Sequence, residues 1–389
     1  MGMKSSEVIN KFLIVTGTFN IEGGKSSHFG EVIYRIFSQH FSDSSGPTID
    51  FINGGNVTDL KPIAESIKDY KIIFWMPHID NMENPPIYGG GDFPINRFAS
   101  VLKKLNPTAI FIQAKRNDND KHTTSEIVIG MLKAHANLCF VLSRDPESGY
   151  SFKVLDPLGN IWYSGIDIEK ATHSMAQFVG SIEPLTRVPS VNDPQHYSPQ
   201  VPGDFLEIVR YYGSVFTTLI NKEINKDRFL GNASTRCMHG FPSVRSNDII
   251  LVSKRNVDKE IISDNDFVPV WREVGEDILH YSGMAKPSVD AAIQVELYKY
   301  YQNVKYIIHG HVYVEGVPYT DKYIPCGYIE EADEIIKLVK DPLAFNFMVN
   351  LIGHGCIMLA KDIGFFKGIR LVARSFPEIL YIYDGMLEK

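Results

Sequence analysis

The sequence has few cysteines and no long apolar run, and both absences narrow the class of protein. Its 389 residues include only 4 cysteines, which are far apart and form no CxxC pair. This pattern argues against a disulfide framework and against a zinc–thiolate site. No apolar run approaches the roughly 18 residues of a membrane-spanning helix, and residues 1–10 lack the apolar region of a signal peptide. We therefore expect a cytoplasmic protein with reduced thiols and no membrane partner.

The sequence also lacks an excess of positive charge. It has 39 Lys and Arg against 46 Asp and Glu, a net charge of -7 at pH 7, which argues against a nucleic-acid partner. Hydrophobic residues make up 44% and charged residues 22%, close to the usage of globular domains and unlike a disordered or coiled-coil chain. A local basic pocket could still hold a small anion.

Closely spaced prolines mark a boundary in the middle of the chain. A length of 389 residues predicts two or three domains at about 150 residues each. The spacing of the prolines allows neither a helix nor a central strand, and they are Pro184, Pro189, Pro194, Pro199 and Pro202. We predict a Rossmann-like α/β domain over residues 1–183, a Pro-rich linker over 184–203 and a second domain over 204–389.

The first half alternates strand-length apolar runs with helical patterns. The expected strands cover residues 12–18, 48–53, 71–76, 109–114 and 138–143. The expected helices cover residues 29–40, 59–69, 96–105 and 124–135. Because parallel strands need crossover connections, this alternation predicts a parallel sheet covered on both faces, of the Rossmann-like or flavodoxin-like kind.

The loops that follow these strands are the candidate ligand sites of the first half. Residues 16–30 (TGTFNIEGGKSSHFG) lead into a helix and could offer backbone N–H groups to an anion, although they match no phosphate-binding motif. The order VTGT, GKSSHFG and NGG loosely resembles the phosphopantothenoylcysteine synthetase type of nucleotide-binding fold. Residues 88–92 (YGGGD) are either a ligand loop or a flexible connection. Whether this half binds a nucleotide, catalyses a reaction or serves as a scaffold stays open.

Three histidines in the second half indicate a metal site. His309 and His311 come at the end of the apolar run 304–308, and residues i and i+2 of a strand project from the same face. His354 lies between glycines in LIGHGCIMLA, just before another strand-like run. Three imidazoles with one open position are the arrangement of a catalytic zinc. The alternative is that the histidines are unrelated packing residues.

The motifs around these histidines resemble the class II aldolase/adducin family. They occur in the family's order as 231–236 (GNASTR), 250–259 (ILVSKRNVDK), 286–298 (KPSVDAAIQVELY), 308–311 (IHGH), 324–326 (IPC) and 353–362 (GHGCIMLAKD). The separation of eight and then eleven positions between Asp290, Tyr298 and His309 also agrees with the family.

This resemblance implies the fold, the metal and the assembly of the second half. It implies an α/β/α fold with a mostly antiparallel sheet, and a homotetramer with sites between subunits. It also implies Zn2+, or another divalent metal, bound by His309, His311 and His354. Asp290 matches the family's acid/base residue, which is glutamate in the aldolase branch and aspartate in the sugar-phosphate 4-epimerase branch. The alternative is that Asp290 is only an acid at a helix N-terminus.

The substrate-binding residues that the resemblance implies depart in part from the family pattern. The positions that hold a substrate phosphate are matched by Asn232, Ser234, Ser253 and Ser288. Lys254 and Arg255, however, replace the neutral Pro-Ser of the family's TPSG turn, and Asn256 replaces its glycine. The two cations either bind a more highly charged anion or point to solvent.

The predicted function is that of a lyase. The segment between His311 and Cys326 is short compared with the epimerase branch, and a single tyrosine donor such as Tyr319 would suffice for a lyase. We therefore predict zinc-dependent aldol cleavage or its reverse on an anionic, phosphorylated, sugar-like substrate of carbohydrate metabolism. The alternatives are a sugar-phosphate 4-epimerase, a related decarboxylase or dehydratase, and a non-catalytic adducin-like assembly module.

Overall fold

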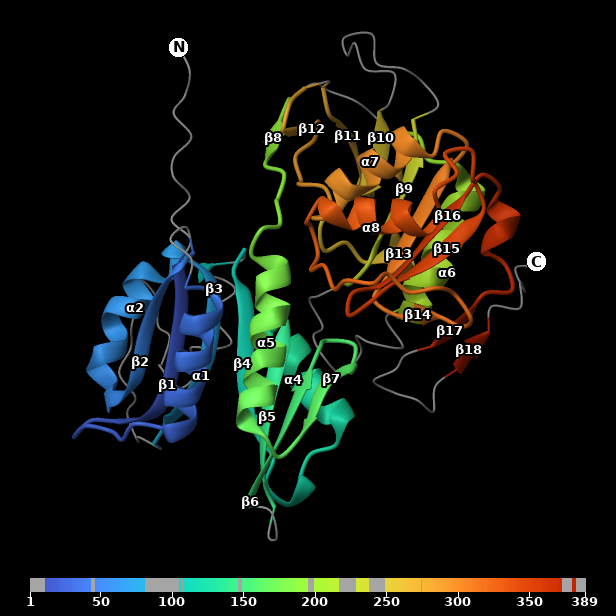
Figure 1. Ribbon diagram of the computed structural model, residues 1–389. Coiled ribbons are helices and arrows are strands. Elements are labelled where there is room, and N and C mark those ends of the chain that lie inside the picture. The colour runs from blue at the N-terminus through green and yellow to red at the C-terminus, as the bar shows by residue number, and fades with distance from the viewer. Residues whose placement is uncertain are drawn as a thin grey trace. The chain divides into compact units, whose positions relative to one another are not determined.

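The chain divides into two compact units, Met1–Glu183 and Pro184–Lys389 (Figure 1). The computed structural model describes residues 11–42, 46–80, 105–106, 108–145, 149–194, 199–216, 229–237, 249–273, 275–372 and 380–382. The loop expected over 88–92, and all but the last residue of the helix expected over 96–105, lie outside the described residues. In the described part of the chain, no helix combines the length and the apolar character that crossing a membrane requires.

The first unit contains a seven-stranded sheet in the order β2-β1-β3-β4-β5-β6-β7. Its strands are β1 (Lys11–Asn20), β2 (Thr48–Asn56), β3 (Tyr70–Ile79), β4 (Ile110–Arg116), β5 (Leu138–Asp145), β6 (Gly149–Leu155) and β7 (Ile161–Gly165). The first five are parallel, as the sequence predicts, and β6 and β7 extend the sheet with antiparallel pairing. The order of the parallel strands is the flavodoxin-like one of the two expected alternatives.

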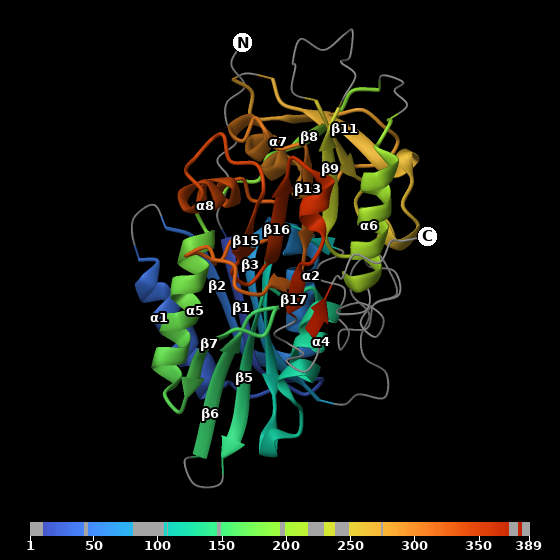
Figure 2. The same cartoon turned by 90° about the vertical axis from the view of Figure 1, so that its right-hand side faces the viewer.

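Helices cover both faces of this sheet, with α1 and α5 on one side and α2 and α4 on the other (Figure 2). Their bounds are α1 (His28–His40), α2 (Lys61–Ser66), α4 (Thr124–Ala134) and α5 (Ile168–Ile182). Short 3-10 turns flank α2 at Val57–Leu60 and Ile67–Asp69, and a third lies at Asp118–Asp120. The helix expected over 59–69 is thus a short α-helix between two 3-10 turns.

The glycine-rich loop after β1 is closed by its own polar groups. The side chain of Ser27 caps α1 by accepting a hydrogen bond from the Gly30 backbone N–H at 3.3 Å. Asn53 Oδ1 accepts from the Ser27 backbone N–H at 2.7 Å, and Asn53 Nδ2 donates to Glu31 Oε1 at 2.6 Å. A carboxylate therefore already lies at the first turn of α1, where a bound anion would be expected. Anion binding by this loop stays a prediction.

The second unit is built on an eight-stranded sheet in the order β15-β16-β13-β9-β10-β11-β12-β8. Its strands are β8 (Ser190–Asn192), β9 (Asn232–Arg236), β10 (Ile250–Ser253), β11 (Phe267–Trp271), β12 (Leu279–Tyr281), β13 (Tyr306–Gly310), β15 (Phe347–Leu351) and β16 (Gly355–Ala360). All pairs are antiparallel except β12 with β8. Strand β8 comes from the Pro-rich segment and lies at the sheet edge, where nearby prolines are tolerated.

Helices α7 (Ala291–Tyr300) and α8 (Glu330–Leu338) cover one face of this sheet, and α6 (Gly203–Phe216) covers the other (Figure 2). A smaller three-stranded sheet is formed by β14 (Tyr313–Val314), β17 (Arg370–Val372) and β18 (Leu380–Ile382). Short 3-10 turns lie at Lys259–Ile261, Asp264–Asp266 and Ile363–Phe366. The predicted α/β fold with a mostly antiparallel sheet is confirmed.

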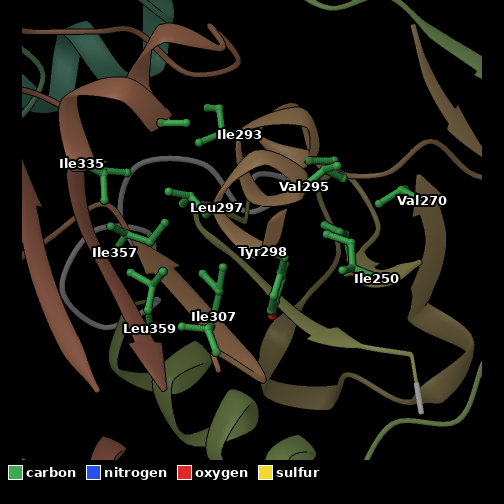
Figure 3. Packing of buried hydrophobic residues seen from close by; sticks show 14 of the residues in the cluster. Ile250, Val270, Ile293, Val295, Leu297, Tyr298, Ile307, Ile335, Ile357 and Leu359 are labelled. Carbon is green, nitrogen blue, oxygen red and sulfur yellow. The ribbon is translucent and has the colours of Figure 1, made fainter. Parts of the chain in front are cut away.

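The face of the sheet under α7 is apolar at alternate strand positions. Ile307 of β13 and Leu359 of β16 are fully buried and pack near Leu297 and Tyr298 of α7 (Figure 3). Because strand side chains alternate between faces, the residue two positions after Ile307 lies on this same face. That residue is His309. The hydrophobic core therefore ends where the polar residues of the candidate site begin.

Candidate metal centre

Three histidines from two separate segments converge at one end of the large sheet of the second unit. His309 lies near the end of β13, His311 follows that strand, and His354 lies in the turn between β15 and β16. Each offers a ring nitrogen within 4.8 Å of the others. His309 and His354 are 2% and 3% exposed, whereas His311 is partly exposed. The grouping expected from the sequence is present, and one of its members is accessible from solvent.

Glycine allows the His354 turn to approach β13 closely. Gly355 has a φ of +147°, and a Cβ atom on it would lie 2.0 Å from the Gly310 carbonyl oxygen. No other residue fits at that separation. Gly355 therefore acts by close backbone approach, as the sequence pattern indicates.

Hydrogen bonds orient the two buried imidazoles. His309 Nδ1 lies 2.8 Å from the Cys356 carbonyl oxygen, which can only accept, so Nδ1 carries the proton and Nε2 carries the lone pair. His309 Nε2 is buried and has no hydrogen-bond partner among the described residues. His354 Nδ1 lies 2.6 Å from Glu331 Oε1, which directs its Nε2 toward the cluster. This is the way that carboxylates and carbonyls orient histidine ligands in metal sites.

The surroundings of His309 and His354 shift the pKa values of the two imidazoles in opposite directions. Burial lowers the pKa of His309 to about 4, and the neighbouring His354 contributes in the same direction. His309 is therefore neutral near pH 7 and its Nε2 can act as a ligand. Burial alone would also lower the pKa of His354, but Cys326 and Glu331 outweigh it and the net shift is upward.

Asp290 stands beside the histidines at the N-terminus of α7. It occupies the N-cap position, but its side chain makes no capping hydrogen bond. Instead, Asp290 Oδ2 accepts from Asn232 Nδ2 at 2.8 Å and lies 3.9 Å from His309 Nε2. Asp290 Oδ1 is buried and lacks a hydrogen-bond partner among the described residues. The carboxylate is therefore directed at the cluster rather than at the helix end.

Three of the four predicted phosphate-binding residues lie around Asp290. Asn232 Nδ2 donates to Ser288 Oγ at 3.1 Å, and Ser288 N donates to the Ser253 carbonyl at 3.1 Å. Ser253 Oγ accepts from the Ala233 backbone N–H at 3.1 Å. Ser234 is different, because its fully buried hydroxyl lies 3.1 Å from Tyr298 Oη between β9 and α7.

Lys254 and Arg255 have different surroundings although they are adjacent. Lys254 Nζ lies 3.5 Å from Asp266 Oδ1, and both side chains are about a third exposed or less. The charge of Arg255 instead interacts with those of Asp290 and Arg187, while partial burial lowers its pKa. Asn256 adopts a φ of +58°, a left-handed conformation that asparagine tolerates better than most residues.

Residues 222–317 match the model of the family described as Class II Aldolase and Adducin N-terminal domain. The predicted resemblance to the class II aldolase/adducin family is thereby confirmed for this segment. The matched segment contains His309, His311 and Asp290, whereas His354 lies beyond it. No curated protein sequence matches this chain.

Several solved structures are each similar to less than half of this chain. The DNA/pantothenate metabolism flavoprotein from Streptococcus pneumoniae has a TM-score of 0.34 at 12% identity, covering 44% of this chain and 99% of that one. A sugar-phosphate aldolase from Thermotoga maritima has a TM-score of 0.30 at 15% identity, covering 45% and 91%. An L-fuculose 1-phosphate aldolase has a TM-score of 0.30 at 16% identity, covering 44% and 82%.

Tyr319, the predicted second proton donor, is joined to the cluster through another tyrosine. Its ring centroid lies 5.0 Å from that of Tyr313. The Tyr313 hydroxyl accepts from the backbone N–H of Gly353, next to His354, at 2.8 Å. Tyr319 is therefore near the His354 turn, and its role in proton transfer stays a prediction.

Two residues of the cluster, Cys326 and Glu331, were not expected from the sequence as partners of His354. Cys326 Sγ lies 2.9 Å from His354 Nε2, whereas the spacing of the cysteines predicts a reduced thiol outside any zinc–thiolate site. Glu331 orients His354, and Gln294 Nε2 donates to Asn232 Oδ1. The IPC motif pointed to Cys326, but nothing in the run EEADEIIKL separates Glu331 from its acidic neighbours.

A buried lysine supports the loop that leads into β9. Lys259 is 5% exposed, and its Nζ donates to the carbonyl oxygens of Val257 at 3.0 Å and Phe229 at 3.4 Å. Burial lowers its pKa to about 8, against an opposing effect of Asp258. The ammonium therefore costs stability in the folded state, while its hydrogen bonds connect two segments near the site.

We predict that the free energy of unfolding rises between pH 8 and 9.5 because of Lys259. In this window the unfolded chain holds the lysine proton and the folded chain releases it, so a higher pH favours the folded state. The rise attributable to this group is about 1 to 2 kcal/mol. Urea unfolding of wild type and Lys259→Met at several pH values measures this rise as a difference in the slope of the free energy of unfolding against pH. An exposed control, Lys367→Met, should keep the wild-type slope. An unchanged slope in Lys259→Met would show that the lysine is charged throughout.

Proposed function

We propose that this protein is a zinc-dependent lyase that makes or breaks the aldol C–C bond of an anionic, phosphorylated, sugar-like substrate. The observation that carries the proposal is the convergence of three histidines with Asp290 at the end of the sheet. The family match supports an aldolase-like or epimerase-like enzyme acting on a small molecule. The identity of the metal as zinc and the lyase reaction go beyond the family match and are part of the proposal.

The residues of the cluster fit a divalent metal. His309 Nε2 and Asp290 Oδ1 are buried polar atoms without hydrogen-bond partners among the described residues, a costly arrangement unless a ligand satisfies them. Imidazole nitrogens are preferred zinc ligands, and His309, His311 and His354 would hold the ion. When bound, zinc would supply a Lewis acid that polarises a substrate carbonyl.

Asp290 is proposed to move the proton that C–C bond cleavage requires. Its Oδ2 is held by Asn232, so the unpartnered Oδ1 is the atom that can accept a proton from a substrate hydroxyl. Gln294 in turn donates to Asn232, which keeps the amide directed at Asp290. Tyr319 is the proposed donor to the leaving carbonyl oxygen.

The anionic group of the substrate is proposed to bind on the other side of Asp290 from the histidines. Asn232, Ser253 and Ser288 supply small polar groups there, as the family resemblance implies. Arg255 adds a guanidinium, which suits phosphate or carboxylate geometry. Lys254 is paired with Asp266, and Ser234 would have to leave Tyr298 to take part.

The sequence leaves three alternatives, which are an epimerase, a decarboxylase or dehydratase, and an assembly module. An aspartate at position 290 is the residue of the 4-epimerase branch, but the short segment between His311 and Cys326 favours a lyase; a decarboxylase or dehydratase uses the same cluster. An adducin-like assembly module would not need three convergent histidines. We further propose a homotetramer, which the resemblance implies.

The proposal is tested by metal analysis together with a substrate screen. Purified wild-type protein should contain about one zinc per chain and release an aldehyde from one or more sugar phosphates or carboxylate analogues. The His309→Ala, His311→Ala double variant should lose both the metal and the activity. Stoichiometric zinc in that variant would place the metal elsewhere in the chain and overturn the assignment.

We predict that Asp290→Asn keeps the metal but lowers turnover by about 100-fold to 10,000-fold, the usual contribution of a positioned acid or base. The amide has the size of the carboxylate but cannot take up a proton. Zinc content and kcat are measured on the same preparation. Loss of zinc from this variant would instead identify Asp290 chiefly as a ligand.

We predict that the two adjacent cations respond differently to truncation. Arg255→Ala should lower kcat/KM by about 10-fold to 150-fold, because a charge-assisted contact to an anion is worth roughly 1.5 to 3 kcal/mol. Lys254→Ala should change it by less than about twofold, since its partner is Asp266. Equal effects of the two substitutions would contradict the separate roles.

A further inference from the structure

The thiol of Cys326 faces the same atom of His354 that the metal would contact. Cys326 Sγ lies 2.9 Å from His354 Nε2. Cys326, Asp290 and His354 also form a second group whose ligand atoms all lie within 4.8 Å of one another. The two candidate ligand sets therefore share His354, and Asp290 Oδ2 of one set lies 3.9 Å from His309 Nε2 of the other.

The turn that carries Cys326 is held in place beside Asp290. Arg187 Nη2 donates to the Cys326 carbonyl at 3.4 Å, and the Arg187 guanidinium lies 4.5 Å from the ring centroid of Tyr328. Gly327 has a φ of +84°, and a Cβ atom on it would lie 3.2 Å from the carbonyl oxygen of Val289. The backbone next to Cys326 thus packs against the backbone next to Asp290, which defines the position of the thiol.

Two buried polar atoms at this point lack partners. His309 and Asp290 are 2% and 6% exposed, and His309 Nε2 and Asp290 Oδ1 have no hydrogen-bond partner among the described residues. A thiol alone does not make a metal site. Here, however, the thiol lies beside these two unsatisfied potential ligand atoms and beside a histidine whose other ring nitrogen is hydrogen-bonded to Glu331. A cation bound by His309, His354 and Cys326 would satisfy His309 Nε2 directly and lie close to the Asp290 carboxylate.

We infer that Cys326 is a thiolate ligand of the metal that the proposed function places at the histidines. The inference rests on that proposed function and adds a sulfur donor to it. On metal binding, the Cys326 thiol gives its proton to solvent and a sulfur–metal bond replaces the hydrogen bond to His354. Ligands about 2.0 and 2.3 Å from a tetrahedral zinc are roughly 3.5 Å apart, so the observed separation needs only a small adjustment.

A thiolate ligand changes what the site can do before substrate arrives. Three histidines leave an open position for substrate, whereas three histidines and a thiolate complete a tetrahedral site. Cys326 therefore closes the centre in the substrate-free protein, and the substrate oxygen must displace it. A sulfur donor also favours zinc over magnesium or calcium, which prefer oxygen donors.

The test uses full-length protein loaded with Co2+, because thiolate bound to cobalt produces an intense charge-transfer absorption in the near ultraviolet and histidine nitrogen does not. Wild type should show this band together with the weaker visible bands of bound cobalt. Cys326→Ser should lose the charge-transfer band but keep the visible bands. The matched control Cys237→Ser, at the end of β9 away from Asn232, should keep both.

Zinc affinity and thiol protection give independent readouts. Cys326→Ser should raise the zinc dissociation constant at least about tenfold in a competition with a chromophoric chelator. In wild type, saturating zinc should slow alkylation of Cys326 by iodoacetamide at least about tenfold, measured by peptide mass spectrometry, and leave Cys237 unaffected. The alkylation result decides the matter even if Cys326→Ser fails to fold.

The outcomes separate this inference from the function on which it rests. Failure of wild type to bind Co2+ or zinc would overturn the proposed metal site itself. Bound cobalt without a charge-transfer band, or a band that persists in Cys326→Ser, would overturn the thiolate ligand alone. Equal alkylation of Cys326 with and without bound zinc would do the same.

Discussion

The candidate site depends on the antiparallel pairing of β13 with its two neighbours. This register places His309 opposite Asn232 on one side and opposite Ile357 on the other. The same pairing brings the Cys356 carbonyl to His309 Nδ1, which orients the imidazole. A shift of one residue would turn His309 to the face covered by α6 and remove it from Asn232. The apolar residues that precede His309 on β13 make such a shift costly.

The cluster holds several buried ionisable groups, and hydrogen bonds from neighbouring side chains offset part of the cost of burying them. Glu331 lies fully buried against His354, and burial raises the pKa of Glu331. Asn232 holds one oxygen of Asp290, and the other has no hydrogen-bond partner in the part of the chain that the structure describes. Burial of charge without compensation is unfavourable, so a set of oriented but incompletely satisfied donors is typical of a place where a ligand completes the network. The same reasoning supports the inference that the Cys326 thiol is one of the metal ligands.

Elements with strong local signals were predicted well. The five parallel strands of the first unit follow apolar runs bounded by turn residues, and each was expected within a few residues of its bounds. Strands β6 and β7 and helix α5 were not expected. In β6 the polar Ser151 and Lys153 alternate with buried Phe152 and Val154, so this strand has no continuous apolar run of the kind that marked the first five. The confirmed family resemblance of residues 222–317 came from ordered motifs rather than from any one of them.

The sequence by itself determined the strand that contains His309 and leads into His311, because the period of a strand puts residues i and i+2 on one face. It also determined the tight turn at His354, because glycine alone permits the backbone approach. Only the tertiary structure decided which charges meet. Lys254 and Arg255 are adjacent in sequence yet have different partners, and Cys326 reaches His354 from 28 positions away. Such contacts depend on how separate segments pack, and a local pattern of residues does not specify which distant side chain a residue will contact.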